Sequence, residues 1–409
     1  MTAGIPAPTH ADLALLTGEP AGELMAGVLS AVGAKPLRWA PRQVDHQPGR
    51  RTTVSYAVRV GWSDGSVTEE TVGASSGQLP AGVARLTDGH TEIGMWRFPF
   101  DPDLPALPAA CDADRMRRLA AEVGLGGDGG AVGLRVRAYR PRRRAVVEIT
   151  APGGTAFAKV VRPAHARGLH ERHRIAAAAG CPVPAALGWT GDGLVMLAGL
   201  PGRTLRDLLT GTGSVRLDVE GIVQLLDTLP AELGAGTRRR TWGQQASRYA
   251  EVIAAVTPEL VDRARAVAAA VDHGARAEGP EVATHGDFYE SQLMTVGGEV
   301  SGLLDIDTAG RGERLDDAGC LLAHLSVLAQ LHPGRAGEIN QLGLRVQRRF
   351  TRDLEPAALA RRTAAVVLSL ATGPHRVQER DWRITTARRI ALAERWLEHA
   401  MEPITDRST

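Results

Sequence analysis

The chain has 409 residues, 44% of them hydrophobic, which is enough apolar material for two or three packed domains. A formal net charge of +2 gives no general reason to expect nucleic-acid binding. The longest apolar runs, such as residues 364–370, fall far short of the ~20 residues that a membrane span needs. We therefore expect neither nucleic-acid nor membrane partners, and the sequence does not choose between a monomer and a homodimer.

Two features indicate a cytoplasmic protein. The chain does not open on a charged segment followed by an apolar one, as a secretion signal would. Its three cysteines, Cys111, Cys181 and Cys320, are widely spaced and odd in number. This usage is typical of a reducing compartment and speaks against a disulfide framework and against a Cys-ligated zinc site.

Residues 1–108 are expected to form an α+β unit without a motif that indicates chemistry. Four prolines between Pro99 and Pro108 break regular structure, so we place a domain boundary in that stretch. The predicted elements before it are a helix at 21–32, hairpin strands at 52–60 and 67–72, and a strand at 95–98.

Residues 109–200 favour a small lobe rich in β-structure. Five short strands, with one helix inserted after the third, indicate an α+β lobe built on an antiparallel sheet. The predicted elements are a helix at 112–123, strands at 132–139, 145–150 and 156–161, a helix at 164–179, and strands at 186–190 and 194–197.

Residues 201–409 favour helices, interrupted by one hairpin at 284–308. The fold class is therefore α+β, with a small antiparallel lobe and a mostly helical lobe, preceded by the extra N-terminal unit. The predicted helices lie at 205–209, 219–229, 242–255, 258–271, 315–330, 337–352, 356–371 and 384–401.

The hairpin carries the strongest chemical signal. It begins with the run His285-Gly286-Asp287, turns at Gly297-Gly298, and ends its second strand on Asp305. An antiparallel pairing brings Asp287 and Asp305 to the same end of the hairpin, with the amide side chain of Gln292 between them in sequence. Such a set is suited to holding Mg²⁺ and to orienting a hydroxyl group for phosphoryl transfer.

The scarcity of lysine draws attention to Lys159. Only two of the 48 basic residues are lysines, Lys35 and Lys159. In a chain that uses arginine almost throughout, a remaining lysine indicates a need for a compact ammonium group. The alternative is chance survival on a surface strand, of which we expect Lys35 to be an example.

At these residues the sequence resembles the aminoglycoside phosphotransferase family, which includes choline, homoserine and sugar kinases of the same protein-kinase-like bilobal fold. The resemblance covers roughly residues 132–317. The family's usual run is His-Gly-Asp, four residues, Asn, and an apolar strand that reaches Ile-Asp. Here Gln292 stands at the Asn position, residues 288–290 fill the loop where the family often has His and Pro, and the strand ends on Leu304-Asp305. A glutamine at that place is similar to maltokinases and related bacterial sugar kinases, which also carry an extra N-terminal unit.

The resemblance implies an ATP-dependent kinase that acts on a small hydroxylated acceptor with Mg²⁺. Asp287 would orient the acceptor hydroxyl and take its proton late in the reaction. Gln292 and Asp305 would hold the metal ion. Asp307 would support it if the strand continues, or is simply a turn carboxylate. His285 is expected to be a structural hydrogen-bonding residue.

For the nucleotide, the resemblance implies contacts from Lys159, on the third strand of the small lobe, to the α- and β-phosphates. Glu171 is the only acidic residue between Val160 and Gly191 and is the expected partner of that lysine. The alternative for Glu171 is a surface bond to Arg167. The connector around Met196 and Ala198 would receive the adenine against its backbone groups.

The basic turn Arg140-Pro141-Arg142-Arg143-Arg144 stands where a phosphate-covering loop is expected, but it has no glycine-rich pattern. Its arginines would either contact phosphate or point into solvent. The two alternatives remain open.

The acceptor is expected to be a sugar, an amino sugar or a natural-product intermediate. Residues 321–409 hold 14 arginines against 9 acidic residues, a net of +5, whereas a pocket for a polycationic aminoglycoside would be expected to carry carboxylates. The acidic cluster of Glu313, Asp316 and Asp317, in contrast, favours a cationic acceptor such as an aminoglycoside. Glu313 and Arg376 are candidate acceptor contacts. The alternatives are an aminoglycoside-type antibiotic phosphotransferase and, from another class, a nucleotide-binding pseudokinase or scaffold.

Overall fold

The structure is a computed structural model that describes residues 11–401, apart from residues 80, 88–90, 127–129, 214–216, 236–237, 239 and 273–278. The chain forms two compact units. The first comprises Met1–His170, Ala186–Gly199 and Pro374–Trp382, and the second comprises Glu171–Ala185, Leu200–Gly373 and Arg383–Thr409. The division into three domains at residues 108 and 200 stays a prediction. Among the described residues, no helix combines the length and apolar character that crossing a bilayer requires.

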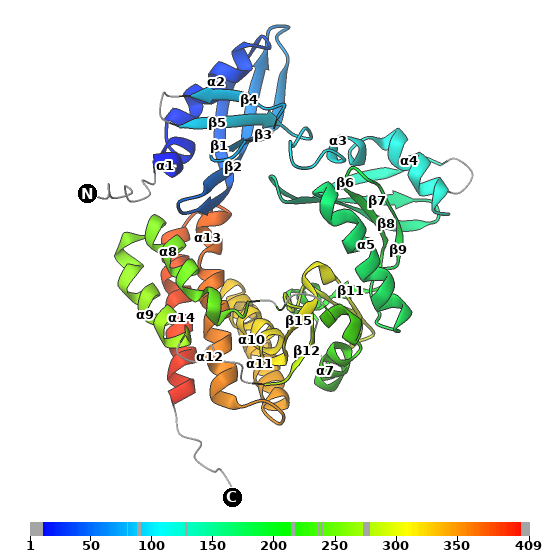
Figure 1. The fold of residues 1–409 in the computed structure, drawn as a ribbon, viewed down its shortest axis with the longest axis vertical. Helices are drawn as coiled ribbons and strands as arrows, with labels where there is room; N and C mark the ends of the chain where they lie inside the picture. Colours follow the sequence, from blue (N-terminus) through cyan, green and yellow to red (C-terminus); the bar gives the residue numbers. More distant parts are fainter. Residues whose placement is uncertain are drawn as a thin grey trace, which may run out of the picture. The chain divides into compact units, whose positions relative to one another are not determined.

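The first sheet of unit 1 has five antiparallel strands in the order β1-β2-β3-β5-β4 (Figure 1). The predicted elements are confirmed as α2 (Pro20–Ser30), β2 (Arg51–Trp62), β3 (Val67–Ser75) and β5 (Glu92–Arg97). Three further elements are not predicted from the sequence: α1 (Ala11–Thr17), β1 (Ala34–Gln47) and β4 (Ala84–Thr87). Strand β1 lies at an edge and carries Pro36 and Pro41 beside its two register shifts, where a residue without an N–H is tolerated.

The second sheet of unit 1 has the order β6-β7-β8-β10-β9 and is antiparallel throughout, as predicted. Its core also takes in Leu104 and Leu107, both fully buried, from the proline-rich stretch before it. That stretch is therefore packed against the second sheet. The elements are α3 (Leu107–Ala110), α4 (Ala113–Glu122), β6 (Gly133–Arg140), β7 (Arg144–Ala151), β8 (Gly154–Val161), β9 (Ala186–Trp189) and β10 (Leu194–Ala198), with α5 (Pro163–Ala178) running from unit 1 into unit 2 after His170.

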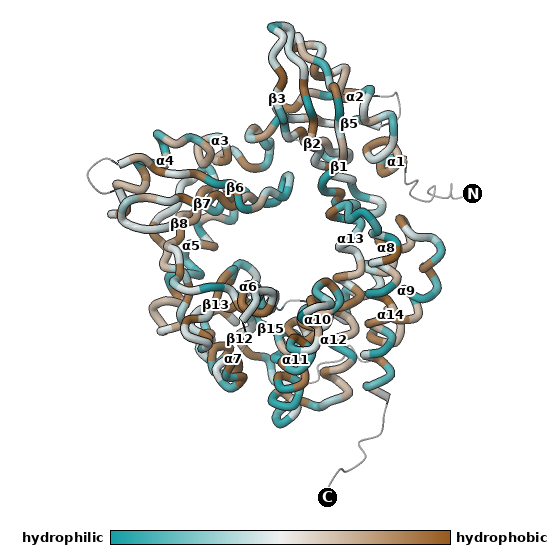
Figure 2. Tube along the Cα trace, turned by 180° about the vertical axis from the view of Figure 1, so that it is seen from behind, coloured by the Kyte–Doolittle hydropathy of each residue, from teal (hydrophilic) through white to brown (hydrophobic). Residues whose placement is uncertain are grey.

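Unit 2 is mostly helical, which confirms the predicted fold class. Two of its helices, α10 and α12, are buried along most of their length. Hydrophobic and hydrophilic residues alternate along outer helices such as α11 (Figure 2), as expected for a helix that buries one face. The helices are α6 (Leu205–Thr210), α7 (Val219–Asp227), α8 (Ala246–Val256), α9 (Val261–Asp272), α10 (Arg314–Leu331), α11 (Ala336–Phe350), α12 (Pro356–Ala371) and α14 (Trp382–Met401), with 3-10 turns at Ala231–Ala235, Gly243–Gln245, Pro258–Leu260, Ile306–Thr308 and Pro333–Arg335.

Two small sheets interrupt these helices. The predicted hairpin is confirmed as β13 (Leu293–Val296) and β14 (Glu299–Leu303), joined on one side by β11 (Arg203–Thr204). Strands β12 (Glu281–Thr284) and β15 (Gly310–Glu313) form a second antiparallel pair, which was not predicted. This pair brackets the His-Gly-Asp loop and the end of the hairpin along the chain.

Candidate active site

The His-Gly-Asp loop follows directly on β12, and His285 connects it to the end of β14. The Nε2 atom of His285 lies 2.8 Å from the carbonyl oxygen of Leu304, and its Nδ1 accepts a hydrogen bond from the backbone N–H of Asp287 at 3.2 Å. Because a backbone N–H only donates and a carbonyl only accepts, Nε2 carries the ring proton. The side chain is fully buried. His285 is therefore a structural residue that sets the position of Asp287, in agreement with the expectation.

Asp317, in the first turn of α10, fixes the backbone of the same loop. Its carboxylate oxygens accept hydrogen bonds from the backbone N–H of His285 at 2.8 Å and of Gly286 at 2.7 Å. Gly286 has a φ of 78°, a conformation that glycine adopts without steric cost. The sequence places Asp317 in an acidic cluster and gives no signal of these partners.

Gln292 and Asp305 lie at the adjoining ends of the hairpin strands. The backbone carbonyl of Gln292 accepts a hydrogen bond from Leu304 at 2.8 Å, so Gln292 lies beside the residue that precedes Asp305. Asp305 has φ 55° and ψ 48°, a left-handed conformation that Asp adopts more readily than most residues. The Gln292 side chain is 6% exposed, and its amide has no hydrogen-bond partner within the described part of the chain. An amide and a carboxylate at adjoining strand ends offer the oxygen ligands that Mg²⁺ prefers.

The backbone after Asp305 differs from the extended strand that was considered for it. Strand β14 ends at Leu303, and Ile306–Thr308 form a 3-10 turn whose Thr308 hydroxyl donates to the carbonyl of His285 at 3.0 Å. The alternation of side chains along a strand therefore does not apply to Asp305 and Asp307. A metal-binding role for Asp307 stays a prediction. A continuing strand no longer supports it, because the strand ends at Leu303.

A buried polar cluster next to the loop was missed by the sequence reading. Glu290 is fully buried and pairs with Arg206, whose Nη1 lies 3.0 Å from its Oε1. The ring of His324 stacks on Tyr289 with centroids 4.1 Å apart. Burial raises the pKa of Glu290, whereas burial together with Arg206 and Arg389 lowers the pKa of His324 from 6.5 to about 3. The available signal was that Tyr289 and Glu290 depart from the usual pattern of the loop.

Glu313, a candidate acceptor contact, lies in a buried ion-pair cluster. Its side chain is 1% exposed and is bonded by Arg238 and by Nη2 of Arg362, the latter at 3.1 Å. Arg362 also bonds Oδ1 of Asp316 at 2.8 Å. The acceptor role of Glu313 stays a prediction, but these contacts already give its carboxylate a structural function.

In unit 1, Lys159 lies on β8, opposite Val146 of β7 and Val195 of β10. It is 6% exposed, so the alternative of a solvated surface lysine is wrong for Lys159, while Lys35 is exposed as expected. Glu171 of α5 is exposed, and its carboxylate bonds Arg174 at 3.2 Å. The alternative prediction for Glu171 was a surface bond to a different arginine, Arg167. The predicted pairing of Lys159 with Glu171 stays a prediction.

The adenine connector follows on β10. Met196 is 2% exposed, Ala198 is partly exposed, and the backbone N–H of the next residue, Gly199, donates to the carbonyl of Thr155 at 2.8 Å. The connector is thus held against β8 by backbone bonds. Adenine binding at Met196 and Ala198 stays a prediction.

The basic turn between β6 and β7 is held by acidic residues of its own unit. Arg142 is 5% exposed, and its Nε bonds Oδ2 of Asp103 at 2.9 Å. Its remaining guanidinium nitrogens donate to the Ser75 hydroxyl and the Gln78 carbonyl, both at 3.0 Å. Its backbone N–H donates to Asp101 at 2.8 Å. Arg142 therefore neither points into solvent nor is free to contact phosphate. Its bonds hold the turn to the rest of unit 1.

Arg376, the second candidate acceptor contact, ends the short helix α13 (Gly373–Arg376). It lines a small cavity of about 20 Å³ in unit 1 together with Gln43, Asp45, Thr53, Arg140, Pro141 and Arg143. Its neighbours are therefore residues of the first sheet and of the basic turn. An acceptor role for Arg376 stays a prediction.

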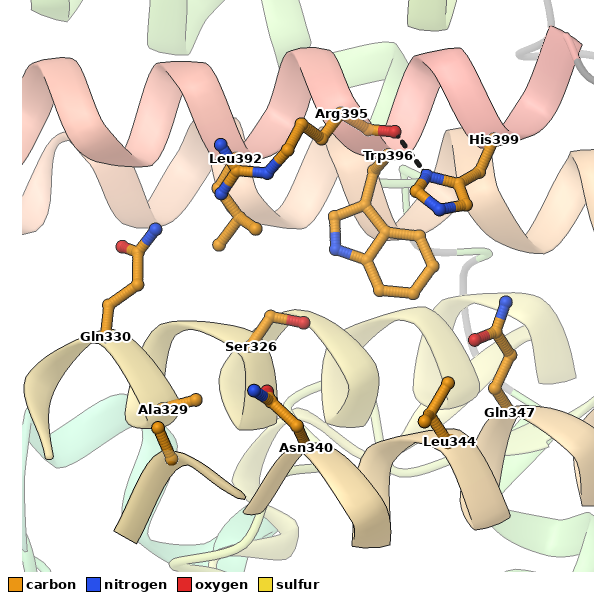
Figure 3. Close-up of a pocket in the computed structure, with 11 residues that line it drawn as sticks. Ser326, Ala329, Gln330, Asn340, Leu344, Gln347, Leu392, Arg395, Trp396 and His399 are labelled. Carbon is orange, nitrogen blue, oxygen red and sulfur yellow. Dashed lines mark hydrogen bonds between the residues drawn. The ribbon is translucent and has the colours of Figure 1, made fainter. Parts of the chain in front are cut away.

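A larger cavity of about 410 Å³ lies in unit 2 between α10, α11 and α14 (Figure 3). The Trp396 indole faces it from α14, and Asn340 and Gln347 face it from α11. It is lined by none of the residues predicted to act on nucleotide, metal or acceptor.

The model of a phosphotransferase enzyme family matches residues 140–349. No curated protein matches the chain.

Similar solved structures include three phosphotransferases or kinases. A thermostable mutant of aminoglycoside phosphotransferase APH(4)-Ia in its apo form is 13% identical, with a TM-score of 0.49, and the match covers 70% of this chain and 100% of that one. Macrolide 2'-phosphotransferase MphH from Brachybacterium faecium is 20% identical, with a TM-score of 0.43 and coverage of 68% and 98%. A choline/ethanolamine kinase family protein from Mesorhizobium loti is 19% identical, with a TM-score of 0.42 and coverage of 70% and 94%. At such identities and TM-scores the likenesses say nothing of what this chain acts on.

Proposed function

Because the chain belongs to the phosphotransferase enzyme family, whose members transfer phosphoryl groups to hydroxyl acceptors, we propose that it is an ATP-dependent kinase for a small hydroxylated molecule. The observation that carries the proposal is the way His285 connects the loop of Asp287 to the strand end that precedes Asp305. One buried imidazole thereby bonds both the backbone of Asp287, the proposed catalytic carboxylate, and the residue before Asp305, a proposed metal ligand.

Asp287 would orient the acceptor hydroxyl in line with the γ-phosphate and accept its proton as the new bond forms. Phosphoryl transfer needs placement and charge neutralisation more than covalent help from the protein. The bonds from Asp317 to the loop backbone support this role, because they fix the two residues that precede Asp287.

Gln292 and Asp305 would hold Mg²⁺, with Asp307 as a further candidate. When bound, the ion would neutralise phosphate charge. Lys159 of β8 would contact the α- and β-phosphates, with Glu171 of α5 as its proposed partner. Met196 and Ala198 would hold the adenine.

The buried ion pairs bear on the choice of acceptor. The carboxylates of Glu313 and Asp316 are neutralised by arginine, and Asp317 is occupied by two backbone N–H groups. The three carboxylates that favoured a polycationic aminoglycoside thus already bond groups of the protein itself. This supports a neutral or anionic acceptor, such as a sugar or a natural-product intermediate, over an antibiotic of the aminoglycoside type.

Thermal-shift measurements with ATP, with and without Mg²⁺, followed by ATP turnover across a panel of sugars and amino sugars, test the proposal. Asp287→Asn should keep nucleotide binding and lower turnover about 100- to 10,000-fold. Asp262→Asn, at an exposed position of α9, is the matched control and should turn over like wild type. If wild type binds ATP, phosphorylates nothing and matches Asp287→Asn, the chain is a nucleotide-binding scaffold and the proposal fails.

A further inference from the structure

Three side chains of different chemistry converge beneath the His-Gly-Asp loop. Cys320 and His324 lie four residues apart on α10, so they share one face of the helix. Asp287 joins them from the loop. One ligand atom from each residue, a sulfur, an imidazole nitrogen and a carboxylate oxygen, lies within 4.8 Å of the other two. Cys320 is fully buried, whereas Asp287 and His324 are partly exposed.

The spacing and donor types fit a cation of intermediate softness. Around a tetrahedral Zn²⁺ a sulfur and a nitrogen ligand lie about 3.5 Å apart, so atoms that lie within 4.8 Å of one another would approach by at most about 1.3 Å. Rotamer changes of Asp287 and His324, the two partly exposed members, can supply such a movement. Thiolate and imidazole ligands disfavour Mg²⁺, which prefers oxygen. We propose that Asp287, Cys320 and His324 form a binding site for Zn²⁺ or a similar divalent cation, separate from the Mg²⁺ ligands, and that occupation of this site blocks phosphoryl transfer.

A second observation concerns Glu290. Its Oε2 atom is buried and has no hydrogen-bond partner in the described part of the chain, yet it lies 4.0 Å from Nδ1 of His324. A metal-bound histidine usually donates its other ring N–H to a carboxylate, which fixes the tautomer and the ring orientation. With the proton on Nδ1, a small approach would give Glu290 its missing donor and leave the lone pair of Nε2 for the cation. The site thus contains its own supporting carboxylate.

The effect on activity rests on the proposed function. A cation at this site takes up the carboxylate of Asp287, which then cannot accept a proton from the acceptor hydroxyl. The Cys320 thiol releases its proton to solvent when the sulfur binds. Inhibition should therefore persist at saturating Mg²⁺ and ATP, because neither occupies the cluster.

Co²⁺ titration of the full chain without nucleotide tests the site independently of catalysis. Wild type should bind one Co²⁺ and develop the sulfur-to-cobalt charge-transfer band in the near ultraviolet. Cys320→Ala should lose the band, and His324→Gln should bind at least about 10-fold more weakly. Cys181→Ala, at another buried cysteine of unit 2, and His332→Gln, just beyond α10, are the matched controls and should behave as wild type. Circular dichroism and thermal unfolding establish that each variant is folded.

The proposal is overturned if no charge-transfer band develops at millimolar Co²⁺, or if folded Cys320→Ala retains it. Zn²⁺ inhibition of ATP turnover, lost in Cys320→Ala, checks the second half. Binding without inhibition in an active enzyme refutes the regulatory effect alone. A band in a protein that turns over no ATP would leave the metal site intact and refute the kinase proposal, so the two failures are distinguishable.

Discussion

The Oδ2 atom of Asp317 lies 2.8 Å from the backbone nitrogen of His285, and Oδ1 of the same carboxylate lies 2.7 Å from that of Gly286. Asp317→Asn replaces one of these acceptors by an NH₂ group, which leaves a buried backbone N–H unsatisfied. We expect the free energy of unfolding to fall by about 1–3 kcal/mol in urea denaturation. ATP turnover should fall as well, because the position of Asp287 depends on this backbone.

The matched control is Asp227→Asn, which removes a 63% exposed carboxylate that pairs with Arg314 on the surface. It should change the free energy of unfolding by less than about 1 kcal/mol. Equal losses in the two variants would contradict the special role of Asp317.

Arg362 links two buried carboxylates, so its removal should be costly. Arg362→Met keeps much of the side-chain volume but removes the guanidinium group that bonds both Asp316 and Glu313. Breaking a buried pair in this way costs about 3–5 kcal/mol, measured as the loss in the free energy of unfolding. Arg265→Met, which breaks an exposed pair with Glu251, should cost at most about 1 kcal/mol. If both variants lose the same amount, the cluster of Glu313 does not have the structural function inferred for it.

Much of the fold could be predicted because local patterns and tertiary structure agree. The second sheet was predicted strand for strand, since each strand alternates or is apolar and each turn carries Gly or Pro. The hairpin of β13 and β14 was equally clear from Gly297-Gly298. Strand β1 is not predicted from the sequence, because prolines argue against a strand. The structure accommodates Pro36 and Pro41 beside register shifts.

Only the part of the site that stands in a sequence motif could be predicted. Asp287, Gln292 and Asp305 stand in an ordered motif, but the partners of Asp317 and Arg142 come from segments far away in sequence. The sequence predicts phosphate or solvent contacts for Arg142, because nothing local reveals that Asp103 and Ser75 bond it. Such contacts depend on tertiary packing, which periodicity does not encode.

Asp103 is the shared acceptor for Arg142 at 2.9 Å and Arg162 at 3.2 Å. Asp103→Asn should therefore loosen the turn between β6 and β7, since two guanidinium groups lose their carboxylate. We expect faster hydrogen exchange of the Arg143 amide, whose N–H bonds the Arg140 carbonyl within this turn. Asp114→Asn, at an exposed position of α4, is the control. Unchanged exchange in Asp103→Asn would show that Arg142 does not anchor the turn.

The pKa of His324, lowered from 6.5 to about 3, predicts a dependence of stability on pH. Below pH 6.5 the unfolded chain takes up a proton at this imidazole, whereas the folded chain does not until near pH 3. Acidification through that window therefore favours unfolding, by up to about 1.4 kcal/mol for each pH unit. Glu290, whose pKa is raised, acts in the opposite direction, because the folded state takes up its proton first as the pH falls.

The difference between wild type and His324→Gln separates the contribution of the imidazole from that of Glu290. Urea denaturation at intervals between pH 7.5 and pH 5 should show wild type losing stability relative to His324→Gln as the pH falls below about 6.5. His332→Gln removes an imidazole just beyond the same helix and serves as the control. Parallel curves for wild type and His324→Gln would mean that His324 charges freely in the folded state. The stacking on Tyr289 and the partial burial of the ring would then not keep the imidazole of His324 neutral in the folded protein.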